Sequence, residues 1–225
     1  MKITSSSLIR WSSLAAMVAG ICFVILGLLH PPNVLSSVTT TRWAIVHSLA
    51  LAMSVFGLLG MVGLYARQVK EAGWLGLAGF LLLSLWLMLI LPFTFFEVFF
   101  LPLLATEAPT FAAGFLGIFT GSASEINFGV LAALWKLSGV LLLLGGLVFG
   151  IATLRAGILS RWAAGLLAVG CVLTPAFALL PPELEPLAAV PIGVGLAWLG
   201  YSLFSERRRE QASEPAPGTG SPQLR

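Results

Sequence analysis

The segment WAIVHSLALAMSVFGLLGMVGLY at residues 43–65 sets the fold class, because its 23 residues include no Asp, Glu, Lys or Arg. An α-helix rises 1.5 Å per residue, so about 20 apolar residues cross the ~30 Å hydrocarbon core of a bilayer. Five more apolar segments of membrane-spanning length occur at residues 12–29, 74–104, 128–154, 162–180 and 187–204, and Glu97 and Lys136 are the only residues of these four types in them. Lipid offers no water to backbone amides, and these runs lack the alternation of a β-barrel strand, so each is predicted to be a helix.

The composition of the chain supports a membrane protein. Of the 225 residues, 58% are hydrophobic and 9% are charged, and the mean hydropathy is +1.00. A soluble domain has about a quarter of its residues charged, so this composition excludes one. We therefore predict an all-α polytopic transmembrane bundle of about six spans within residues 1–204, with the lipid bilayer as its expected partner and no nucleic acid. Residues 205–225 are charged and then Pro/Gly/Ser-rich, which predicts a disordered cytoplasmic tail.

The positions of Lys and Arg predict the orientation, because short cytoplasmic loops retain these residues. With the N-terminus inside, ten of them are cytoplasmic, Lys136 falls within a span, and only Arg42 lies outside. The predicted location is therefore the cytoplasmic (inner) membrane, multi-pass, with both termini in the cytoplasm. The 12–29 segment ends in His30-Pro31-Pro32 without a small-residue cleavage site, so we expect a retained span. Aromatic side chains are expected to mark the inner interface at Trp11, Tyr65, Trp74, Trp162, Trp198 and Tyr201, and the outer interface at Trp43.

Small residues predict where the helices pack, because lipid supplies no hydrophobic drive and helices associate where their backbones approach closely. Glycines recur at three- and four-residue steps in three spans. They are Gly57, Gly60, Gly63, Gly73, Gly76, Gly79, Gly146 and Gly150. The two cysteines, Cys22 and Cys171, lie inside spans with no metal or disulfide spacing, and we interpret them as packing residues.

Four ionisable residues at membrane depth are the candidate binding residues, because a charge there is costly and is usually functional. They are His30, His47, Glu97 and Lys136. The two His and the Lys each lie 18 residues from the inner end of their span, roughly 27 Å along a helix. Glu97 lies 23 residues from Trp74, and tilt or the kink expected at Pro92 would lower it. All four are therefore predicted to share one layer near the outer edge of the hydrocarbon.

We hypothesise that Glu97 and Lys136 form a shielded ion pair, with His30 and His47 beside them in an outward-facing polar pocket. Lys136 shares a helical face with Gly129, Ala132, Ala133 and Gly139, which favours an inward direction. The alternative is that all four side chains are simply solvated at the headgroup level. A lid over the pocket is expected from the loop at residues 105–126, as a re-entrant turn or as a helix lying on the surface.

Other chemistry finds no support in the sequence. The chain has no Asp, and it lacks the P-loop, H-E-x-x-H, C-x-x-C and G-x-S-x-G motifs. No metal and no cofactor are expected. His30 and His47 are predicted to lie in the same layer, so both could in principle bind a haem iron. They are the only two His in the chain, and haem binding is therefore disfavoured.

Several short motifs resemble a widespread family of uncharacterised bacterial multi-span inner-membrane proteins, a domain of unknown function. The resemblance covers roughly residues 10–205 and rests on Leu29-His30-Pro31, Arg42-Trp43 with His47, Gly63-Leu64-Tyr65-Ala66-Arg67, Glu97 after Pro92, and the run Leu154-Arg155-Ala156-Gly157-Ile158-Leu159-Ser160-Arg161-Trp162-Ala163. It implies a cytoplasmic-membrane location and a helical bundle. It implies no reaction.

Three classes of function remain open from the sequence. The favoured class is a small carrier or binding protein that uses the outer polar pocket for a small ion or solute. A structural or accessory subunit without a ligand is the first alternative. The second alternative is a membrane-embedded enzyme with His47 or Glu97 as acid or base. Such an enzyme needs several side chains in a catalytic geometry, which the sequence alone does not show. The oligomeric state also stays open.

Overall fold

The computed structural model describes residues 5–181 and 184–213, and all regular structure in these ranges is helical. This confirms the predicted all-α class. In chain order the elements are α1 (Ser5–Leu29), α2 (Leu35–Val38), α3 (Thr41–Phe99), α4 (Leu101–Glu107), α5 (Pro109–Thr120), α6 (Leu131–Ala156), α7 (Arg161–Phe177), the 3₁₀ turn η1 (Glu185–Ala188) and α8 (Ala189–Ser213).

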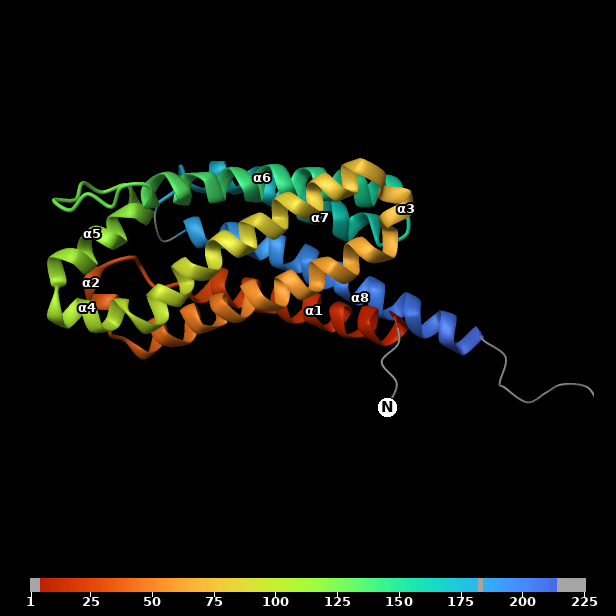
Figure 1. Ribbon diagram of the computed structural model, residues 1–225, viewed down its shortest axis with the longest axis horizontal. Helices are drawn as coiled ribbons and strands as arrows, with labels where there is room; N and C mark the ends of the chain where they lie inside the picture. The colour runs from red at the N-terminus through yellow and green to blue at the C-terminus, as the bar shows by residue number, and fades with distance from the viewer. Residues whose placement is uncertain (1–4, 182–183, 214–225) are drawn as a thin grey trace, which may run out of the picture.

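Four helices of the described chain are long and apolar enough to cross a membrane. They are Ser7–Leu29, Thr41–Phe99, Leu131–Ala156 and Glu185–Glu206, and the shorter apolar helices are Pro109–Thr120 and Arg161–Phe177. The 59 residues of α3 are interrupted by non-helical backbone at Gln68 and Gly73. Gly73 has a φ of +55°, a left-handed conformation that glycine adopts at no steric cost. There α3 turns back on itself, so its two arms run antiparallel (Figure 1).

The boundaries of several elements differ from the predicted ones. The predicted segment 74–104 ends as a helix at Phe99, because the chain turns at Phe100 into the separate helix α4. At the other end of the chain α8 continues to Ser213, so residues 205–213 of the predicted disordered tail are helical. Apolar composition locates a span but does not report where its helix stops. Residues 214–225 of that tail lie outside the described residues.

Glycines bring the long helices into close contact. A Cβ on Gly60 would lie 2.6 Å from Cα of Ala16 in α1, and one on Gly79 would lie 2.4 Å from the backbone N of Phe149 in α6. These positions confirm that helices pack where glycine allows backbones to approach. Gly73 was expected to pack in the same way, but a Cβ there would meet nothing within 4 Å. It forms the turn of α3 instead.

Three short helices, α2, α4 and α5, lie together at the end of the bundle opposite the α3 turn (Figure 1). We call them the cap. The cap and the adjoining ends of the long helices share an apolar cluster whose buried members are Val38, Trp43, Phe93, Leu101, Ala112, Phe115 and Leu116. The loop predicted to be a lid therefore contains α5, a helix that packs against the end of the bundle.

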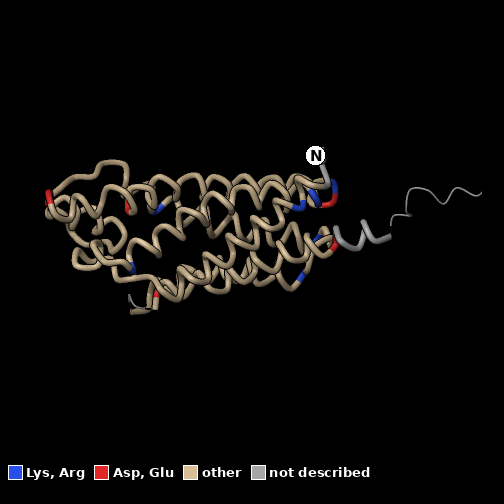
Figure 2. Tube along the Cα trace, turned by 90° about the horizontal axis from the view of Figure 1, so that it is seen from below, with Lys and Arg blue, Asp and Glu red and all other residues tan. Residues whose placement is uncertain are grey.

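Basic residues concentrate at one end of the bundle (Figure 2). The end with the α3 turn carries most of the described basic residues, namely Arg10, Arg67, Lys70, Arg155 and Arg161. Arg67 pairs there with Glu206 of α8 through two nitrogen–oxygen contacts. Trp74 and Trp162, at the same end, are 86% and 80% exposed, as an interfacial position requires. Trp43 was predicted to mark the opposite interface, and this prediction is wrong because its side chain is fully buried.

Candidate functional site

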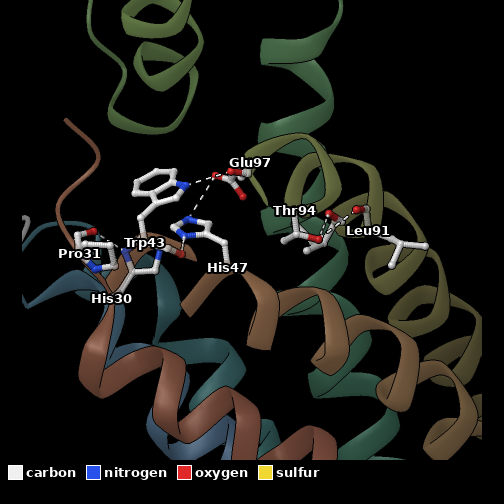
Figure 3. Close-up of polar contacts among 8 residues, drawn as sticks. His30, Pro31, Trp43, His47, Leu91, Thr94 and Glu97 are labelled. Atoms are coloured by element: carbon white, nitrogen blue, oxygen red, sulfur yellow. Dashed lines mark hydrogen bonds and ion pairs between the residues drawn. The ribbon is translucent and has the colours of Figure 1, made fainter. Parts of the chain in front are cut away.

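A buried pair of ionisable residues lies beneath the cap. His47 comes from the first arm of α3 and Glu97 from the end of the second, and their side chains meet because the two arms are antiparallel. His47 is 2% exposed and Glu97 is 7% exposed. The Nε2 of His47 lies 3.7 Å from Oε1 of Glu97 (Figure 3). This separation is within ion-pair range and too long for a hydrogen bond.

The helix backbone fixes the ring of His47. Its Nδ1 donates a hydrogen bond to the carbonyl oxygen of Trp43 at 2.9 Å, one helical turn earlier. A carbonyl can only accept, so Nδ1 carries a hydrogen and a neutral ring presents the lone pair of Nε2. That Nε2 is buried and has no hydrogen-bond partner in the part of the chain that the structure describes. It therefore faces Glu97 as an unsatisfied acceptor, or as a donor once the ring is protonated.

Trp43 is a third member of the site that sequence analysis placed elsewhere. Its indole stacks on the His47 ring, with centroids 3.8 Å apart and planes at 21°. Its Nε1 donates a hydrogen bond to the backbone carbonyl of Glu97 at 3.0 Å. The spacing of four residues between Trp43 and His47 puts both on one helical face, and this signal was available in the sequence.

His30 occupies the outer edge of the same site. It directly follows α1, is half-buried, and its Nδ1 donates to the carbonyl of Pro31 at 2.7 Å. The rings of His30 and His47 meet edge to face, with centroids 5.2 Å apart. Arg42 holds the end of α1 by donating from Nε to the carbonyl of Leu29 at 2.8 Å. Burial lowers the pKa of His30 below its usual value, and the charge of Arg42 acts in the same direction.

Lys136 does not belong to this site. The predicted ion pair with Glu97 is wrong, because Lys136 is exposed and none of the ion pairs among the described residues includes it. The buried face of α6 consists of Ser138, Leu142, Gly145, Gly146, Phe149, Gly150, Ala152 and Thr153. Gly139, which was taken to mark the inward face together with Lys136, is also exposed. The structure thus brings together three of the four predicted residues, and the acidic one pairs with an imidazole.

Two ionisable groups that face each other in the interior suit the binding of a proton. No group of three potential metal ligands exists among the described residues. An apolar groove of about 500 Å³ lies between α1 and α8, away from this pair, and Met17, Ile21, Val194 and Trp198 contribute to its lining. An imidazole and a carboxylic group that face each other away from water can share one proton and stay neutral together, which avoids the cost of a buried unpaired charge.

Fold and site together define a helical protein with four helices suited to crossing a membrane and a buried His–Glu pair near one end. No protein-family model, curated protein or solved structure matches the chain. The resemblance to bacterial inner-membrane proteins therefore stays a prediction.

Proposed function

We propose that this protein is a small carrier or binding protein of the cytoplasmic membrane that takes up a small ion or solute together with a proton. The observation that carries the proposal is the contact between Nε2 of His47 and Oε1 of Glu97, two buried ionisable groups 3.7 Å apart with no hydrogen bond to His47 Nε2 among the described residues. Ionisable side chains inside membrane bundles typically mark ion or proton pathways.

The proposed topology has six spans, with both arms of α3 counted separately and both termini inside. The distribution of charge supports it, because Lys and Arg concentrate at the end that holds the α3 turn (Figure 2). On this topology the cap and the His47–Glu97 pair lie at the outer side of the membrane. The sequence resemblance to bacterial inner-membrane proteins supports the same membrane and a bacterial origin.

Two groups that exchange one proton supply the coupling that a proton-linked carrier needs. When the pair holds the proton as a neutral acid or as an ion pair, its net charge is zero. The protonated pair also presents an N–H or O–H donor to the acceptor groups of a solute, whereas loss of that proton removes this donor and leaves a costly net negative charge in the interior. The binding of proton and solute are then linked through one carboxylate.

Flux into proteoliposomes tests this function. Vesicles that contain the purified protein and an internal pH-sensitive dye are placed in acidic medium, with potassium and valinomycin to hold the voltage at zero. Sodium, lithium, neutral amino acids, monosaccharides and short carboxylates are then added one at a time. We expect at least one of these to accelerate acidification of the lumen, and Glu97→Gln to abolish the effect. The exposed Lys136, at the same end of the bundle, provides the matched control Lys136→Met, which keeps the flux.

A structural subunit is the competing function, and the stacking of Trp43 on His47 favours it because a buried ring can serve packing alone. In that case the lumenal pH changes no faster after any added solute than it does in protein-free vesicles, or Glu97→Gln gives the same flux as the wild type. Either result contradicts the carrier.

A further inference from the structure

His30 lies beside the buried pair, next to the ring of His47 (Figure 3). It follows the last residue of α1, Leu29, and it is half-buried, whereas His47 and Glu97 are buried. His47 lies between His30 and Glu97 (Figure 3). The two ring centroids are 5.2 Å apart, and His47 in turn approaches Glu97 at 3.7 Å. Three ionisable groups therefore form a row that begins at a half-buried side chain and continues through two buried ones.

The hydrogen bonds of His30 leave one nitrogen for proton exchange. Nδ1 donates to the carbonyl of Pro31, so Nε2 carries the lone pair of the neutral ring. The backbone beneath the ring is held by Arg42, whose guanidinium donates to the carbonyls of Leu29 and His30. The ring thus has a fixed site for gaining and losing a proton.

The surrounding charges favour passage of a proton over its storage. Arg42 is the cation that contacts the His30 backbone, and Glu97 is the acidic residue that contacts His47. The other charged groups that the structure describes at this end are exposed and form no ion pair with either imidazole; they are Glu107, Glu125, Lys136 and Glu185. Two imidazolium ions at this distance repel each other, so His30 releases its proton before the pair takes up a second one.

We propose that His30 is the residue through which protons enter and leave the buried His47–Glu97 pair. Water at this end of the bundle donates a proton to Nε2 of His30, which becomes an imidazolium. The imidazolium then gives up that proton, through an intervening water, to Nε2 of His47 or to the Glu97 carboxylate, and returns to the neutral ring. The inference rests on the proposed proton site at His47 and Glu97, and it gives His30 a separate role, which is to set the rate of proton exchange with that site.

A rapid pH jump on the purified full-length protein in detergent tests the relay. The readout is the fluorescence of Trp43, because an indole stacked on an imidazole is quenched more strongly when that imidazole is protonated. The chain has seven Trp, so the fluorescence change of the Trp43→Phe variant is subtracted from that of the wild type to give the contribution of Trp43. We expect His30→Gln to keep the amplitude but to slow its approach to equilibrium about tenfold or more. Imidazole added to the buffer is expected to restore the rate, as a diffusible replacement for the lost ring. Lys136→Met is expected to relax at the wild-type rate.

The outcomes separate the relay from the proton site. An unchanged rate in both His30→Gln and His30→Asn overturns the relay and leaves the buried pair in place. A slow rate that imidazole does not restore also overturns it, since His30 then acts through structure alone. An amplitude that survives Glu97→Gln overturns the proton site and the relay together.

Discussion

The indole Nε1 of Trp43 donates a hydrogen bond to the backbone carbonyl of Glu97, and these residues are 54 positions apart in the chain. The bond joins the start of the first arm of α3 to the end of its second arm. It also holds the stacked Trp43 and His47 rings close to Glu97. This hydrogen bond is therefore one of the contacts between the arms that fix the geometry of the site.

Trp43→Phe is expected to lower the free energy of unfolding by about 1–3 kcal/mol, because it leaves the buried Glu97 carbonyl without this donor. Unfolding of the purified protein in mild detergent measures the effect. The control is Trp74→Phe, whose side chain is 86% exposed and which is expected to change stability by no more than about 0.5 kcal/mol. Equal effects of the two substitutions would show that the hydrogen bond from Trp43 to the Glu97 carbonyl does not contribute to stability.

Gly79→Ala is expected to lower stability by about 1–3 kcal/mol, because the added methyl group would lie 2.4 Å from the backbone of Phe149. Gly139→Ala is the matched control, since Gly139 lies in helix α6 and a Cβ there meets nothing within 4 Å. It is expected to be neutral or to gain up to about 1 kcal/mol of helix propensity. Thermal unfolding compares the two, and a Gly79→Ala protein as stable as the wild type contradicts the packing of α3 on α6.

Thr153→Val is expected to cost about 1–3 kcal/mol, because it removes the partner of the fully buried Gln68 amide, which donates to Thr153 Oγ1 at 2.9 Å. Adding Gln68→Met to this variant removes the unsatisfied amide and is expected to recover most of the loss. A denaturant titration of the two single variants and the double variant measures the coupling. Strictly additive losses would be inconsistent with a hydrogen bond at this turn.

The proposed topology predicts which exposed positions react with a membrane-impermeant maleimide in intact cells. Thr39, before α3, and Glu71, in its turn, are both exposed and lie at opposite ends of the bundle. In a background with Cys22 and Cys171 replaced by Ala, Thr39→Cys is expected to react in intact cells. Glu71→Cys is expected to react only after permeabilisation. The reverse pattern would show the opposite orientation.

The helical class and the shared layer of the candidate residues could be predicted from the sequence, because both follow from the cost of placing polar groups in lipid. His30, His47 and Glu97 do come together at one end of the bundle. Hydrophobicity and the 1.5 Å rise per residue were sufficient for that prediction, since helix length converts directly into depth.

The partners of those residues could not be predicted, because they depend on the direction of each side chain. Lys136 and Gly139 share a face of α6, and that face is exposed rather than packed. Small residues accompany lipid-facing surfaces as well as contacts between helices. Similarly, Trp43 has the position of an interfacial tryptophan, but its N–H finds the Glu97 carbonyl and the ring is buried. Whether Trp43 is interfacial or buried depends on how the two arms of α3 are arranged, and the sequence does not give that arrangement.

The central claim is that His47 and Glu97 hold one exchangeable proton, and infrared difference spectroscopy over a pH titration tests it most directly. A protonated carboxylic group has a C=O band distinct from that of the carboxylate. We expect a pH-dependent band that Glu97→Gln removes and whose midpoint shifts in His47→Gln. A spectrum with no pH-dependent band assignable to Glu97 would contradict the account.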